Sequence, residues 1–298
     1  MTVDVREKAC LNHEEVLSLN FIIDPGIYLF RRHHKQGLRS HIMEVLQRND
    51  VERERKGAVI DGIRWFPRAK PIKMLRIFRT KFKTLEEASE EIRTVKIIEK
   101  YLAPDHVAES DEFLVDYVME GKRDFILCGL QEYVEGEILD PWSPITREHL
   151  AELFSRMDID SRDASGMTTE LLIQRVQKKI ENFIKRVKRM ILEANHVPDL
   201  AGVGNLLITA VGDIKLVDIN NISKVSFEPT IKIDDKGYPV CDKSIEALSL
   251  LEQKILASPI DMAETVYRTF LDAQRMREVK VLEERFHFSM KYPFYDMD

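Results

Sequence analysis

The sequence contains few of the features that mark secreted or membrane proteins. Only three of its 298 residues are cysteine, Cys10, Cys128 and Cys241, and their odd number and wide spacing fit neither a disulfide framework nor a metal-binding pattern. No apolar run approaches membrane-spanning length, and the N-terminal residues lack the apolar segment of a signal peptide. We therefore expect a reduced, cytoplasmic protein without a membrane span.

The chain also lacks an excess of positive charge. Its 45 basic and 51 acidic residues give a net charge of −6, whereas a dedicated nucleic-acid binder needs basic surface to neutralise phosphates. With 44% hydrophobic and 32% charged residues, the composition is that of an ordinary globular protein. A chain of this length can bury a large core in one domain or in two lobes. We expect a globular protein whose partners do not include nucleic acid.

Residues 196–223 carry the pattern most informative about chemistry. Two short apolar runs flank a turn at residues 210–213, which predicts a β-hairpin. The two outer ends of a hairpin meet, so Asn205, before the first strand, and Asp218, after the second, should lie side by side, with Asp199 on the loop that leads to them. Two oxygen ligands beside a further carboxylate suit a Mg²⁺–nucleotide site. Alternatively, these residues only cap the hairpin and a helix end.

In order and in hydrophobicity, this stretch resembles the catalytic segment of the protein-kinase-like superfamily, which includes the aminoglycoside and choline phosphotransferases. The family pattern is a catalytic Asp, an Asn, two strands and a metal-binding Asp. The resemblance implies that Asp199 orients or deprotonates the attacking hydroxyl, and that Asn205 and Asp218 bind the Mg²⁺ of Mg-ATP. Two departures are visible: one extra residue lies between Asp199 and Asn205, and the usual Phe-Gly after Asp218 is absent.

The resemblance also assigns a phosphate-binding residue upstream. Residues 73–79 predict a strand that is partly alternating and has one polar face. Alignment on this strand places Arg76 where the family has a Lys that holds phosphate oxygens, and Lys73 and Arg79 are alternatives. Arg keeps the positive charge, although its planar fork is not equivalent to a Lys ammonium. The alternative without function is an exposed, charged edge strand.

A helix is predicted after this strand. A Thr-x-x-Glu capping box at residues 84–87 marks its beginning, and an apolar stripe continues to residue 102. The resemblance implies that Glu91 pairs with Arg76, and Glu87 and Glu90 compete for that role. Taken as helix positions alone, these glutamates are surface charges.

The string EYVEG follows a predicted buried strand at residues 125–130 and resembles the kinase hinge. The resemblance implies that Gln131 is the gatekeeper and that the backbones of Glu132 and Val134 contact adenine. A Gly-rich phosphate loop is not visible, since Gly57 and Gly62 stand alone.

The implied fold class is α+β, a two-lobed protein-kinase-like fold. It would comprise an N-terminal helical extension over residues 1–50, a small β-rich lobe over 51–135 and a mostly helical lobe over 136–298. Periodicity predicts a long amphipathic helix at 168–195. Other helices are predicted at 14–19, 40–46, 146–157, 244–257 and 263–286, with a polar loop at 158–166 and an unassigned tail at 292–298.

Residues 31–35 form a basic run that contains His33 and His34. A solvated face is favoured here over a phosphate or metal site, because no third ligand lies nearby in the sequence.

The predicted function is transfer of the γ-phosphoryl group of ATP, with Mg²⁺, to a hydroxyl of an unknown small molecule or protein. The missing Gly-rich loop, Arg76 in place of Lys and the longer loop after Asp199 favour an alternative, a nucleotide-binding pseudokinase that acts as a regulatory or scaffold protein. A third possibility is a helical binding protein that takes no nucleotide.

Overall fold

The computed structural model describes residues 4–19, 22, 24, 26–37, 39–119, 121–157, 166–235 and 237–291. Residues 158–165 of the predicted loop at 158–166 and the tail at 292–298 lie outside these residues. Contacts divide the chain into two compact units. Unit 1 comprises Met1–Ile92 and Ala108–Tyr133, and unit 2 comprises Arg93–Val107 and Val134–Asp298. Helices accompany antiparallel sheets, which confirms the α+β class.

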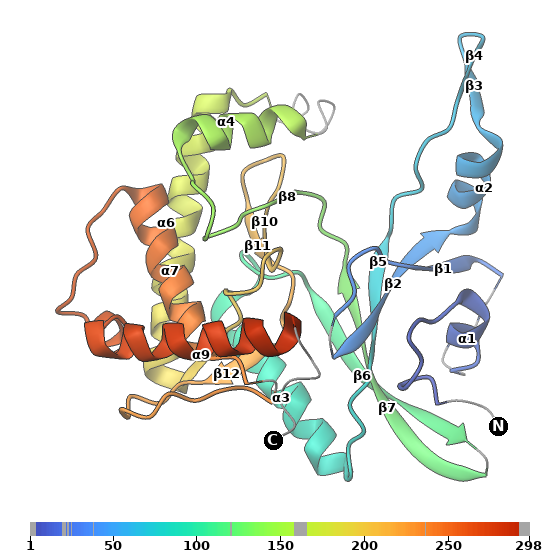
Figure 1. Ribbon diagram of the computed structural model, residues 1–298. Coiled ribbons are helices and arrows are strands. Elements are labelled where there is room, and N and C mark those ends of the chain that lie inside the picture. The colour runs from blue at the N-terminus through green and yellow to red at the C-terminus, as the bar shows by residue number, and fades with distance from the viewer. Residues whose placement is uncertain are drawn as a thin grey trace. The chain divides into compact units, whose positions relative to one another are not determined.

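A five-stranded antiparallel sheet forms the centre of unit 1 (Figure 1). Its strands, in spatial order, are β1 (Tyr28–Arg32), β2 (Ser40–Gln47), β5 (Lys73–Phe78), β7 (Lys122–Glu132) and β6 (Ser110–Met119). The strand predicted at 73–79 is confirmed as β5, but the alternative of an exposed edge strand is wrong. Because β5 lies between β2 and β7, its residues from Met74 onward are buried on both faces.

The prediction of a helix at 40–46 is wrong, because these residues form β2. Each edge of β2 has a partner strand, with Leu46 opposite Leu29 on β1 and Met43 opposite Leu75 on β5. The apolar residues Met43, Val45 and Leu46 are buried in the sheet. The helix predicted at 14–19 is present as α1 (His13–Leu17), which begins with a capping box at Asn12.

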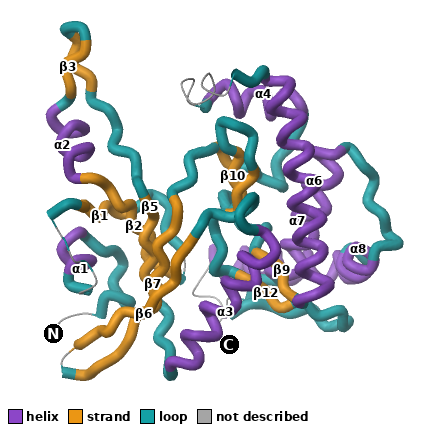
Figure 2. Tube along the Cα trace, turned by 180° about the vertical axis from the view of Figure 1, so that it is seen from behind, coloured by secondary structure: helices purple, strands orange, loops and turns teal. Residues whose placement is uncertain are grey.

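A short hairpin follows α2 (Arg48–Lys56) and consists of β3 (Ala58–Ile60) and β4 (Ile63–Trp65). Asp61 and Gly62 form its turn with φ of 50° and 80°, the left-handed conformation that such turns require. Both views show the hairpin extending beyond α2 (Figures 1 and 2). Its large apolar side chains are exposed.

The capping prediction at 84–87 is confirmed by α3 (Leu85–Leu102). Thr84 Oγ1 accepts a hydrogen bond from the Glu87 amide at 3.2 Å, and the Glu87 carboxylate accepts one from the Lys83 amide at 2.7 Å. The Thr84 bond satisfies an amide group that the first helical turn leaves without a partner, whereas the Glu87 bond goes to the residue before Thr84.

Unit 2 is mainly helical and has its own core. The predicted long helix is confirmed as α6 (Thr169–Ala194), which Thr168 caps and which ends at Asn195 in the left-handed conformation. Its apolar stripe is buried against α7 (Val240–Leu256) and α4 (Arg147–Arg156). These two helices correspond to the helices predicted at 244–257 and 146–157.

The helix predicted at 263–286 is interrupted. It divides into α8 (Thr265–Phe270) and α9 (Ala273–Lys291). The Asp272 carboxylate accepts hydrogen bonds from the amides of Gln274 and Arg275, so it caps a new helix where one continuous helix was predicted.

Two small sheets support the stretch 196–223. The predicted hairpin is confirmed as β10 (Leu206–Ile208) and β11 (Ile214–Leu216). A third strand, β8 (Glu137–Ile138), pairs with the other edge of β10. A second pair joins β9 (His196–Pro198) to β12 (Ile222–Lys224). Within the residues described, no helix has the length and apolar character needed to cross a membrane.

Candidate functional site

The end of the β10–β11 hairpin brings Asn205 next to the segment that contains Asp218. Leu206 pairs with Leu216, and the Asn205 carbonyl accepts a hydrogen bond from the Val217 amide at 2.9 Å. This bond continues the strand pairing by one step, so Asp218 follows directly after the residue opposite Asn205. Both residues are half-buried.

Asp199 lies at the end of β9, and donors from two segments hold its carboxylate. Oδ1 accepts hydrogen bonds from the amides of Ala201 at 3.0 Å and Gly202 at 3.1 Å. Oδ2 accepts a hydrogen bond from Asn221 Nδ2 at 2.6 Å. The Asp199 amide donates to the Asn221 carbonyl at 2.9 Å, which continues the β9–β12 pair. The carboxylate is therefore fixed on a strand end as well as on the loop that follows.

The pKa of Asp199 lies above its ordinary value of 3.8. Burial is the main cause, since the residue is only 8% exposed, and the charge of Asp218 acts in the same direction. The amides of Gly202 and Ala201 and the side chain of Asn221 lower the pKa without cancelling these effects. Two carboxylates therefore share one neighbourhood in unit 2, a pattern typical of functional sites.

The Asn205 side chain is oriented by the same loop. Its Nδ2 donates to the Asp199 carbonyl at 2.9 Å, and no hydrogen bond within the described part of the chain uses its Oδ1. Gly202 is needed for this arrangement, because a Cβ at that position would lie 2.5 Å from Asn205 Nδ2. The extra residue between Asp199 and Asn205 is thus accommodated in a loop that still joins the two residues by a hydrogen bond.

Other residues that support the loop were missed in the sequence. Trp142 Nε1 donates to the Ala201 carbonyl at 3.0 Å, and the Leu200 amide donates to Ser244 Oγ at 3.1 Å. Of the residues that hold the loop, only Asn221 could have been suspected from the sequence, because it lies three residues after Asp218 in the stretch 196–223. Trp142 and Ser244 come from distant segments, and nothing in their local sequence indicates this role.

The donor set of this site suits a hard divalent cation. Asp218 offers a carboxylate, Asn205 offers an amide oxygen, and the charge of Asp218 acts on the buried Asp199 carboxyl. Mg²⁺ is commonly bound through one or two such oxygen ligands, with phosphate and water completing its shell. These residues therefore fit Mg²⁺.

In unit 1, Arg76 and Gln131 are brought together. Arg76, only 5% exposed, donates from its guanidinium to Gln131 Oε1 across the paired strands β5 and β7. Glu91 instead forms an ion pair with Arg39 at 3.9 Å. Burial raises the pKa of Glu91, and Arg39 lowers it only in part. In the described part of the chain, Glu91 on α3 thus pairs with Arg39, and its pairing with Arg76 stays a prediction of the resemblance.

The predicted hinge residues lie where the chain passes from unit 1 to unit 2. Glu132 is the last residue of β7, and its amide donates to the Glu109 carbonyl at 2.7 Å. Val134 is the first residue of the second part of unit 2.

The chain matches no protein-family model and no curated protein sequence.

Proposed function

We propose that the chain is an ATP- and Mg²⁺-dependent phosphotransferase with a two-lobed, protein-kinase-like fold. The observation that carries this proposal is the arrangement of Asp199, Asn205 and Asp218 in unit 2. Asn205 is hydrogen-bonded to the Asp199 backbone, and the Asp199 carboxylate is close enough to Asp218 for the charge of Asp218 to raise its pKa. Phosphoryl transfer to a hydroxyl commonly uses such a carboxylate to orient the acceptor and such oxygen ligands to hold Mg²⁺.

In the proposed mechanism, Asp199 binds and orients the acceptor hydroxyl. The raised pKa of its carboxyl makes it a stronger base than an exposed Asp, which favours proton acceptance from that hydroxyl. The donors from Ala201, Gly202 and Asn221 fix its direction before the acceptor arrives. Mg²⁺, held by Asn205 and Asp218, would neutralise phosphate charge.

Arg76 and the segment from Gln131 to Val134 are assigned to nucleotide binding in this proposal. Arg76 would contact phosphate oxygens, and the backbones of Glu132 and Val134 would contact adenine. The acceptor is a hydroxyl of a small molecule or a protein.

A specific observation favours a second candidate, a nucleotide-binding pseudokinase. Arg76 donates to Gln131, and Glu91 pairs with Arg39, so the acidic partner expected for the phosphate-binding residue is engaged elsewhere. Such a protein would bind nucleotide and act as a regulatory or scaffold protein without catalysing phosphoryl transfer.

Thermal unfolding with and without Mg-ATP tests nucleotide binding. A ligand that binds only the folded state at a hundredfold excess over its dissociation constant stabilises it by about 2.7 kcal/mol, so we expect a clear rise in Tm. Asp218→Asn should lose the Mg²⁺-dependent part of that rise. Asp235→Asn is the matched control, because it removes an exposed carboxylate outside the site.

Turnover distinguishes the two candidates. For the phosphotransferase, ATP consumption should occur with an acceptor screen and should fall by at least about 10²-fold in Asp199→Asn, within the range that general base catalysis contributes. A Tm rise without ATP consumption would select the pseudokinase. No Tm change at millimolar Mg-ATP would refute both.

A further inference from the structure

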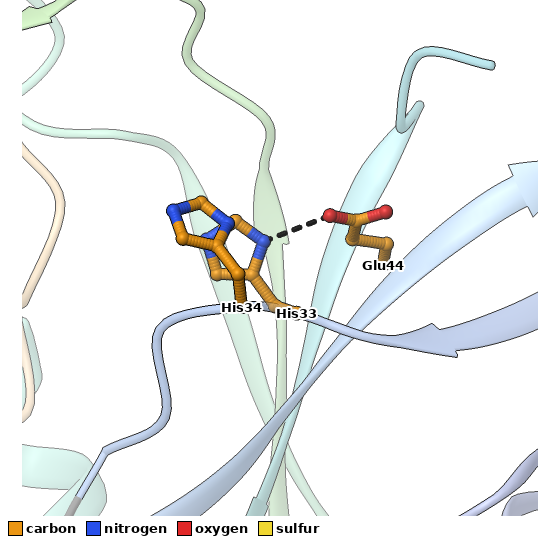
Figure 3. A group of neighbouring side chains, drawn as sticks. All are labelled: His33, His34 and Glu44. Atoms are coloured by element: carbon orange, nitrogen blue, oxygen red, sulfur yellow. Dashed lines mark hydrogen bonds and ion pairs between the residues drawn. The ribbon is translucent and has the colours of Figure 1, made fainter. Parts of the chain in front are cut away.

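The pairing of β1 with β2 supplies the third polar group that the sequence around His33 and His34 lacks. Arg31 on β1 lies opposite Glu44 on β2, and the His33 amide donates to the Ile42 carbonyl at 2.9 Å, which extends this pairing. Glu44 therefore reaches His33 from the neighbouring strand (Figure 3).

The three side chains form a compact cluster within unit 1. His33 Nδ1 lies 2.9 Å from Glu44 Oε1, and the two imidazole rings have centroids 4.2 Å apart. One nitrogen of each histidine and one oxygen of Glu44 all lie within 4.8 Å of one another. The histidines are partly or fully exposed, whereas Glu44 is only 3% exposed.

We propose that His33 and His34 bind a divalent transition metal of the zinc class, with Glu44 as the carboxylate that orients His33. A carboxylate on one ring nitrogen is the usual partner of a metal-binding histidine, because it fixes the tautomer and leaves the other nitrogen for the metal. Here the Glu44–Nδ1 bond directs Nε2 of His33 to that role.

The distances are compatible with such a site. Ligand atoms at about 2.0–2.1 Å from a tetrahedral metal lie about 3.4 Å from each other. One nitrogen of each histidine already lies within 4.8 Å of the other, and rotation of the exposed His34 ring would bring the ligand nitrogens to that tetrahedral separation. Solvent access at His34 leaves room for water to complete the coordination.

The surrounding charges decide which kind of ion fits. Glu44 Oε2 accepts a hydrogen bond from Arg31 Nε at 2.8 Å, and Arg68 lies 4.0 Å from Glu44 Oε1. With its carboxylate shared in this way, the cluster cannot offer the several free oxygens that Ca²⁺ or Mg²⁺ requires, whereas imidazole nitrogens suit Zn²⁺, Cu²⁺ and Ni²⁺.

Zn²⁺ binding to the full chain, purified without a histidine tag, tests the proposal by competition with a chromophoric chelator. We expect one Zn²⁺ per chain in the wild type and loss of that site in His34→Ala and His33→Ala. His149→Ala is the matched control, because it removes an exposed histidine from α4 in unit 2 and should bind as the wild type does. Removing an orienting carboxylate typically costs about 10–100-fold in affinity, so Glu44→Gln should bind more weakly by that factor.

Co²⁺ provides a second readout, since visible absorption bands should appear in the wild type and be absent in His34→Ala. His34 is exposed, so its substitution should leave the fold intact and circular dichroism unchanged. Absence of stoichiometric Zn²⁺ binding in the wild type, or equal binding by His34→Ala, would overturn the proposal.

Discussion

Replacement of Asn221 by alanine tests how the candidate carboxylate is held, whatever the protein's reaction. Asn221 Nδ2 donates to Asp199 Oδ2 at 2.6 Å, and the residue that accepts this bond is only 8% exposed. The variant removes the donor but keeps the backbone bond between the Asp199 amide and the Asn221 carbonyl. Its effect should therefore report the side-chain interaction.

The expected cost follows from the charge of the acceptor. Hydrogen bonds to charged groups contribute about 1.5–3 kcal/mol, compared with about 0.5–1.5 kcal/mol for neutral pairs. We expect Asn221→Ala to lower the unfolding free energy of unit 2 by about 1.5–3 kcal/mol at pH 7. In an Asp199→Asn background the same change should cost only about 0.5–1.5 kcal/mol, because the acceptor is then neutral.

The direction in which the cost of Asn221→Ala changes with pH can also be checked. The pKa of Asp199 is raised, so its ionisation costs folded-state stability as pH rises through that pKa. Asn221 stabilises chiefly the ionised form, since its side chain lowers this pKa. The cost of Asn221→Ala should therefore be largest above the pKa of Asp199 and should shrink as the carboxyl becomes protonated at lower pH.

Urea unfolding read by tryptophan fluorescence can measure this effect. The chain has two tryptophans, and Trp142 contacts the Asp199 loop through the Ala201 carbonyl. A Trp65→Phe background, in which the exposed hairpin residue is replaced, leaves Trp142 as the reporter of unit 2. A cost of Asn221→Ala that is the same with and without the Asp199→Asn change, or one that is independent of pH, would refute the reasoning.

Three further outcomes are expected. Gly202→Ala would place a Cβ 2.5 Å from Asn205 Nδ2, and this crowding should cost about 1–3 kcal/mol in urea unfolding; a neutral effect would show that the loop adapts freely. Arg275→Met would leave the buried Asp242 carboxylate without its ion-pair partner and should cost about 3–5 kcal/mol in the same assay. Burial lowers the pKa of His106 below its ordinary value of 6.5, although Asn182 and the Ile214 carbonyl oppose this. Since the unfolded chain then binds the proton first, stability should fall as pH decreases below about 6.5, and His106→Gln should flatten that part of a urea-midpoint profile.

Several elements could be predicted because their signals are local. The apolar stripe of α6 and its capping by Thr168 are read within one segment. The same is true of the β10–β11 turn, which sets Asn205 and Asp218 at one end of a hairpin. A local signal was also overlooked: Asp61 and Gly62 between apolar residues are a typical hairpin turn, and they form the one between β3 and β4.

Elements that depend on distant partners were predicted less well. Residues 40–46 were predicted as a helix, yet pairing with β1 and β5 makes them a strand. The partners of Arg76 and Glu91 likewise depend on strand order and on the direction of α3. Such outcomes follow from non-local hydrogen bonds and burial, which can override local propensity.

The sequence by itself determined the helices with a clear apolar stripe, the β10–β11 hairpin and the order of Asp199, Asn205 and Asp218 along the chain. Only the tertiary structure decided that Asn221 fixes Asp199, that burial and Asp218 raise its pKa, and that Glu44 joins His33. The physical reason is that backbone periodicity and turns are set by neighbouring residues. The environment of a charged side chain is set instead by whichever segments the fold packs around it.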